Sequence, residues 1–154
     1  MERLVVLGTG NALATACYNT CFALENDRGI VLVDAGGGNG ILAQIQKADL
    51  QWERIRHLIV THEHCDHLLG VVWVFRKITT MIKADQYKQD FHIWCHAKLE
   101  QTIRLICEAT FWYGRKSISP KDAGTTPAAS TSPTIWTFWI WRLTPERANE
   151  CQAH

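Results

Sequence analysis

Three histidines and one aspartate stand within six consecutive residues near the middle of this 154-residue chain: His62, His64, Asp66 and His67. Imidazole nitrogens and carboxylate oxygens are the ligands that first-row metals, above all zinc, prefer in proteins. Side chains alternate along an extended segment, so His62 and His64 point to the same side if this run leaves a strand. Asp66 and His67 then lie past the turn. The spacing predicts two adjacent metal ions, one on His62 and His64 and one on Asp66 and His67.

The segments on either side of this run support a metal site on rigid elements. Residues 55–60 (IRHLIV) are largely apolar, which indicates a buried strand. Residues 67–81 carry apolar side chains at helical spacing, and Gly70 allows a close backbone approach near the start of that helix. A strand, a ligand loop and a helix in this order hold ligands in fixed positions.

A structural role for these histidines is the alternative, because a single histidine is more often a core or surface residue than a ligand. Several imidazoles placed together without a metal are costly to bury and repel one another when charged, which favours metal binding here. Glu63 and Cys65 alternate with the ligands and are expected to face away. Cys65 is a weaker candidate ligand.

Three motifs in this order resemble the metallo-β-lactamase-fold hydrolases. The first is the His-x-His-x-Asp-His signature, carried by His62, His64, Asp66 and His67. The second is residues 31–36 (VLVDAG), similar to the family's strand that ends in an aspartate before glycine. The third is the start of the chain, residues 4–11 (LVVLGTGN), followed by YNTCF at residues 18–22. The start and the Asp-His-Leu-Leu-Gly spacing at residues 66–70 look most like the ribonuclease Z and phosphodiesterase branch.

The resemblance implies an α/β fold, the N-terminal half of a four-layer αββα sandwich. We expect this half domain to span residues 1–116, with an irregular low-complexity and Trp-rich tail over residues 117–154. Within the half domain, patterning and turn residues predict three strands, then helices alternating with strands. The expected strands are 4–7, 21–25, 30–33, 55–60 and 91–95, and the expected helices are 39–48, 67–81 and 97–112.

The resemblance also implies a metal-dependent hydrolase, most similar to phosphodiester hydrolysis of the ribonuclease Z type by a metal-activated hydroxide. It implies zinc, two ions in the complete family, although manganese or iron suits the same donors. Asp66 is expected to be both a ligand and the catalytic proton acceptor. Asp34 is expected to orient a ligand histidine by a hydrogen bond rather than to bind metal. The family pattern gives His92 and His96 no ligand role, and we expect structural roles for both.

Composition limits the partners. The formal net charge is +1, and no basic cluster marks a nucleic-acid surface, so an RNA or small-molecule phosphodiester substrate rests on the resemblance alone. The chain has no run of 18 apolar residues, so we predict no membrane span. The N-terminus enters a strand without a signal-peptide pattern, which predicts a cytoplasmic protein with its six cysteines reduced.

The composition changes after Tyr113. Residues 117–134 are rich in Ser, Thr, Pro, Ala and Gly, which indicates a linker, and the apolar run at 135–141 (IWTFWIW) could form a strand. The resemblance implies further ligands from a second half, and only His154 and the poorly placed Asp122 follow. We therefore hypothesise that the chain is truncated or frame-shifted near residues 113–116. Its bare sheet face would then favour a homodimer or aggregation; the alternative is a tail strand that completes a small domain.

Two other functions stay open at this point. The same fold and ligands can serve thioester or lactam hydrolysis, because a fold does not fix its substrate. A chain without the downstream ligands can also be an inactive product that binds metal weakly.

Overall fold

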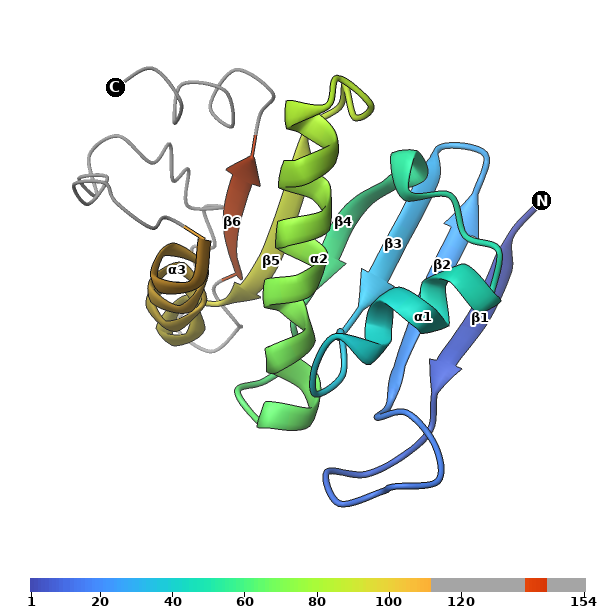
Figure 1. Ribbon diagram of the computed structural model, residues 1–154, viewed down its shortest axis with the longest axis vertical. Coiled ribbons are helices and arrows are strands. Elements are labelled where there is room, and N and C mark those ends of the chain that lie inside the picture. Colours follow the sequence, from blue (N-terminus) through green and yellow to red (C-terminus); the bar gives the residue numbers. More distant parts are fainter. Residues whose placement is uncertain (112–137, 144–154) are drawn as a thin grey trace, which may run out of the picture.

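A single six-stranded mixed sheet forms the body of the computed structural model, which describes residues 1–111 and 138–143 (Figure 1). The strands lie side by side in chain order: β1 (Arg3–Gly8), β2 (Cys21–Asn26), β3 (Gly29–Val33), β4 (Ile55–Ile59), β5 (Phe91–His96) and β6 (Phe138–Leu143). β3, β4 and β5 are parallel, whereas the β1–β2, β2–β3 and β5–β6 pairs are antiparallel. The five strands predicted for the half domain are confirmed.

Three helices accompany the sheet: α1 (Gly40–Lys47), α2 (Cys65–Lys83) and α3 (Ala97–Phe111), with a short 3₁₀ helix η1 (Trp52–Arg54) before β4. Figure 1 shows α1 and α2 lying over the same face of the sheet, and α2 packs against both α1 and α3. The three predicted helices are confirmed, but α2 begins two residues before the expected start at His67. None of the helices in the described ranges is long and apolar enough to span a membrane.

Side chains alternate between the two faces of the sheet, and the helices cover only one of these faces. On the face that the helices cover, Ala23, Leu32, Leu58 and Ile93 follow one another across β2 to β5 and are at most 1% exposed. On the opposite face the register aligns two rows of mostly apolar residues, which we call the open-face rows. They are listed here from β1 to β5: Leu4, Leu24, Val31, His57 and His92; then Val6, Phe22, Val33, Ile59 and Trp94.

Parallel pairing of β3 and β4 brings two loops to the same edge of the sheet. Each strand is followed by a crossover helix, so the carboxyl ends of β3 and β4 are neighbours. The backbone N–H of Asp34, just after β3, donates to the carbonyl of Ile59 over 2.8 Å. The residues after β4 are the predicted ligands, so the topology places Asp34 beside them.

The turn after β3 is fixed to the start of α2 by close backbone packing. The N–H of Ala35 donates to the carbonyl of His67 over 3.1 Å, and the N–H of Gly70 donates to the carbonyl of Gly36 over 2.8 Å. A Cβ on Gly70 would lie 1.7 Å from the carbonyl oxygen of Ala35, so only glycine permits this approach. The close approach predicted for Gly70 is confirmed.

The Trp-rich segment contributes the edge strand β6, which pairs with β5 from His96↔Phe138 to Phe91↔Leu143. The linker predicted at 117–134 and the end of the third helix at residue 112 lie outside the described residues. The boundary between a half domain and a tail stays a prediction.

Candidate metal centre

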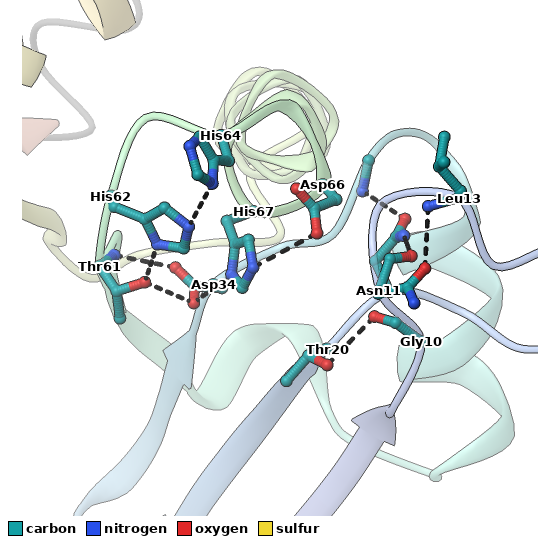
Figure 2. A network of polar contacts seen from close by, with 12 residues as sticks. Gly10, Asn11, Leu13, Thr20, Asp34, Thr61, His62, His64, Asp66 and His67 are labelled. Carbon is teal, nitrogen blue, oxygen red and sulfur yellow. Dashed lines mark hydrogen bonds and ion pairs between the residues drawn. The ribbon is translucent and has the colours of Figure 1, made fainter.

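The predicted ligands meet at the point where β4 passes into α2 (Figure 2). His62 lies in the connecting loop, His64 is the N-cap of α2, and Asp66 and His67 lie in the first turn of the helix. The helix was expected to begin at His67, so Asp66 was expected just before it, whereas α2 already begins at Cys65. A carboxylate in the first turn of a helix is stabilised by the partial positive charge of that end, which favours the earlier start.

Two pairs of donor atoms stand at ligand-like separations. His62 Nε2 lies 3.2 Å from His64 Nδ1, and His67 Nε2 lies 3.4 Å from the Asp66 carboxylate. Donors about 2.1 Å from a tetrahedral zinc ion are themselves about 3.4 Å apart. The rings of His62 and His67 have their centroids 4.1 Å apart, so the two pairs are neighbours. All four predicted ligands therefore lie close together, with His62 next to His64 and Asp66 next to His67, and their pairing on two ions stays a prediction.

Asp34 lies beneath these ligands and is 5% exposed. Its carboxylate accepts hydrogen bonds from the backbone N–H and the hydroxyl of Thr61, both over 2.8 Å, and contacts His67 Nδ1 over 2.8 Å (Figure 2). Its φ of 59° is left-handed, a conformation that aspartate tolerates better than most residues. Backbone strain of this kind persists where the surrounding contacts hold it in place.

These contacts orient two imidazoles. With its hydroxyl proton donated to Asp34, Thr61 accepts from Nδ1–H of His62 over 2.9 Å. Nδ1–H of His67 donates directly to Asp34. In both neutral rings Nε2 is then unprotonated, and an unprotonated imidazole nitrogen is the atom that can bind a metal.

Asp34 also belongs to a looser group with His62 and His67, in which one possible ligand atom of each lies within 4.8 Å of the others. Asp34 already accepts three hydrogen bonds, which is the environment of an orienting carboxylate. Its role stays a prediction, and so do the roles of the four ligands.

The turn from Asp34 to Gly38 is held by a loop that precedes β2. The Tyr18 hydroxyl lies 2.9 Å from the carbonyl of Ala35 and 2.8 Å from that of Gly38, and Asn19 accepts from the N–H of Gly37. Burial raises the pKa of Tyr18 to about 12, so the hydroxyl stays protonated and can donate. The YNTCF motif was noted in the sequence, but its supporting role depends on contacts that only the fold creates.

Exposure does not decide the orientation expected for Cys65 and Glu63, and Glu63 lines the same cavity as His62. Cys65 and Glu63 are exposed, and the cysteines in the described ranges are free thiols. Burial raises the pKa of the Cys21 thiol to about 12, so it stays protonated. Cys21 is 1% exposed in strand β2 and packs in the core.

A cavity of about 420 Å³ opens beside His62, lined on one side by the loop after β4 and on the other by the start of α3. His96, Lys98 and Thr102 are among its lining residues. Sequence reasoning gave His96 a structural role and did not consider Lys98 or Thr102. Nothing in their local sequence marks them, because the pairing of β4 with β5 is what places α3 beside the ligand loop.

The fold and the site define a protein with the metallo-β-lactamase fold. The family model described as the anti-Pycsar protein Apyc1 matches residues 2–107, and the chain belongs to that family.

Curated relatives include the ribonuclease Z of Phocaeicola vulgatus, 28% identical over 67% of this chain and 32% of that protein. The ribonuclease Z of Thermococcus kodakarensis is 29% identical over 91% of this chain and 43% of that protein. Among solved structures, human tRNase Z, short form, has a TM-score of 0.58 at 25% identity, over 71% of this chain and 39% of that chain.

The chain spans less than half the length of these relatives. The family match ends at residue 107, near the composition break, whereas the Thermococcus alignment covers 141 residues and extends past Tyr113. The truncated or frame-shifted origin of the tail stays a prediction, to be tested by translating the other frames of the coding DNA.

Proposed function

We propose that this chain carries the N-terminal half of the metal site of a ribonuclease Z-like phosphodiesterase. The main support is the closeness of His62 to His64 and of Asp66 to His67. Hydrogen bonds from Asp34 and Thr61 orient two of these histidines. The ribonuclease Z relatives support hydrolysis of a phosphodiester, and RNA is the substrate class that their names suggest.

The donor set fits zinc, because neutral imidazole and carboxylate at tetrahedral separations are its usual ligands. His62 and His64 hold one ion, and Asp66 and His67 hold the second. Divalent metal in such a site polarises phosphoryl oxygens and activates water for attack. Asp66 is 8% exposed, which suits a carboxylate that must bind metal and accept a proton away from bulk water.

Asp34 and Thr61 act through the histidines. Asp34 keeps Nε2 of His67 available by accepting the proton on Nδ1, and Thr61 does the same for His62. Partners of this kind change metal affinity by about 10- to 100-fold. We also propose that two copies associate through the open-face rows, and the cytoplasmic location stays a prediction.

Metal stoichiometry of the purified and dialysed chain is the first test, measured by elemental mass spectrometry against protein concentration. We expect retained zinc, lost in His62→Ala and in Asp66→Ala. Absence of bound metal in the wild-type chain would contradict the proposal. Full occupancy without turnover of bis(p-nitrophenyl) phosphate would instead favour an inactive, metal-binding product.

Asp34→Asn tests the orienting role, because asparagine tolerates a left-handed φ but turns an amide N–H₂ toward two donors. We expect zinc affinity to fall about 10- to 100-fold by calorimetric titration. Asp27→Asn removes the same charge from an exposed hairpin position and is the matched control. Equal affinities for the two variants would refute the role of Asp34.

A further inference from the structure

A second cavity lies between the loop that precedes β2 and the outer end of α1. Its volume is about 670 Å³, which is within the range of small-ligand sites. Residues 6–9 form one wall, residues 14–19 of the loop form another, and Gln44 and Lys47 of α1 form the third. The described residues that line it include none of the four predicted metal ligands, so the proposed metal chemistry does not use this cavity.

Two sequence motifs outside the ligand run build the loop wall of this cavity: the Gly-Thr-Gly turn after β1 and the Tyr-Asn-Thr run before β2. The N–H of Gly10 donates to the carbonyl of Tyr18, and the N–H of Thr20 donates to the carbonyl of Gly10, both over 2.8 Å. A Cβ on Gly8 would lie 2.1 Å from the carbonyl oxygen of Asn19, so only glycine lets the loop close here. Backbone contacts at both ends of the loop therefore fix this wall.

Lys47 is the only charged side chain among the described residues that line the cavity. It is exposed, and its ammonium makes no hydrogen bond or ion pair with another described residue. Gln44 and Lys47 are three residues apart, so they lie on the same face of α1. The amide of Gln44 and the hydroxyls of Thr9 and Thr15 are neutral groups that can donate hydrogen bonds. One cation with neutral donors and no lining carboxylate favours an anion with oxygen acceptors.

We propose that this cavity binds a small oxyanion, a phosphate monoester or a carboxylate, and that Lys47 pairs with its charge. Thr15 on the loop wall and Gln44 on the helix wall supply the neutral donors. The anion is a ligand distinct from the substrate of the metal site, so the inference goes beyond the proposed function and stands or falls separately. Tyr18 lines the cavity and also holds the turn after Asp34, so a bound anion contacts the loop that supports the metal centre.

Titration of the isotope-labelled chain with inorganic phosphate or with malonate, followed by two-dimensional NMR, measures the affinity and the location of binding together. We expect saturable shifts of the amide signals of Thr9, Thr15 and Gln44 with at least one of the two anions. Saturation by phosphate alone identifies phosphate monoesters as the ligand class, and saturation by malonate alone identifies carboxylates. Saturation by both identifies a site for either kind of oxyanion, which also supports the proposal.

The charge at position 47 should control the affinity. Lys47→Gln should raise the Kd about two- to fivefold, the range of one exposed ion pair. Lys47→Glu should raise it further because its carboxylate repels the ligand, and Lys47→Arg should keep the affinity because arginine also binds oxyanions. Lys83→Gln is the matched control, since it removes a lysine from the last turn of α2, and its Kd should equal that of the wild type.

Two further variants keep the test decisive. Thr15→Asp places a carboxylate on the loop wall and should raise the Kd even if changes at Lys47 disturb α1. His62→Ala, which should lose zinc, should bind the anions like the wild type, and loss of binding in this variant would place the anion at the metal centre instead. That result overturns the inference. So does a wild-type chain without saturable shifts at the cavity, or a wild-type Kd in both Lys47→Glu and Thr15→Asp.

Discussion

The two faces of the sheet have nearly the same apolar composition and very different surroundings. On the covered face, Leu32 and Leu58 are 0% exposed beneath the helices. On the open face, Leu4, Val6 and Leu24 are 61%, 59% and 46% exposed. On the parallel strands β3 and β4, Val31, Val33 and Ile59 of the same face are only partly buried. Parallel strands that are nearly continuous apolar runs are normally buried on both sides. The sequence of these strands is therefore suited to a second layer on the open face, as the αββα resemblance implies.

The predicted metal ligands lie at the edge where the helix layer meets the sheet. Asp66 and His67 are on α2, whereas Asp34 follows β3 in the sheet. Packing of the covered face thus sets the ligand geometry directly. The open face stabilises the sheet without touching the ligands, so damage to the two faces should have separable effects.

A matched pair of leucines gives the largest expected contrast. Leu32→Ala on the covered face should lower the free energy of unfolding by about 2–5 kcal/mol, because the cavity forms in a closed core. Leu24→Ala on the open face, on the neighbouring strand, should cost about 1 kcal/mol because nearly half of that side chain is already exposed. Urea unfolding followed by circular dichroism measures both, and similar costs would mean that the open face is covered in solution.

Gly70→Ala should couple stability to metal binding. The added Cβ forces α2 away from the Ala35 carbonyl, which should cost about 1–3 kcal/mol or more. The same shift moves Asp66 and His67 relative to Asp34, so zinc affinity should fall as well. Leu24→Ala is the control that leaves zinc affinity unchanged. A Gly70→Ala chain with wild-type zinc affinity would show that the helix layer does not set the site.

Charges on the open face should change association more than stability. Val6→Lys and Leu24→Lys place ammonium groups on exposed positions and should change the free energy of unfolding by less than about 1 kcal/mol. Sedimentation velocity should show less self-association than in the wild type. Lys47→Ala, an exposed position on α1, is the control for general surface effects. Unchanged sedimentation would contradict association through this face.

The pH dependence of the open face is the smallest expected effect. Burial, then His92 and Arg56, holds the pKa of His57 below its ordinary value, and Trp94 donates to its Nδ1 over 3.2 Å. The neutral ring therefore stabilises the fold above the ordinary pKa of about 6.5, and this contribution is lost as the pH falls through the lowered value.

His57→Gln keeps an acceptor for Trp94 and removes the titration. Urea unfolding at pH 7.5 and 5.0 should show a smaller loss of stability in the variant than in the wild type. Equal losses would assign the pH dependence to other groups.

Much of the molecule followed from its sequence. Apolar periodicity and the turn residues between the segments placed the strands and helices because both patterns are local. The four ligand candidates followed from their chemistry and spacing, and Gly70 from its place near the helix start. The sequence did not predict that α2 begins at Cys65, because residues 65–67 are polar or small and show no apolar helical spacing.

Tertiary structure alone decided the rest. Thr61 links Asp34 to His62 only because β3 and β4 are parallel neighbours. The left-handed Asp34 depends on contacts from two elements, and Lys98 reaches the cavity beside His62 only through the pairing of β4 with β5. Ligand chemistry is carried by side chains that are close in sequence, so the sequence determined it. The orientation of those ligands and the cavity beside them are made by residues far apart in the chain, so only the fold could determine them.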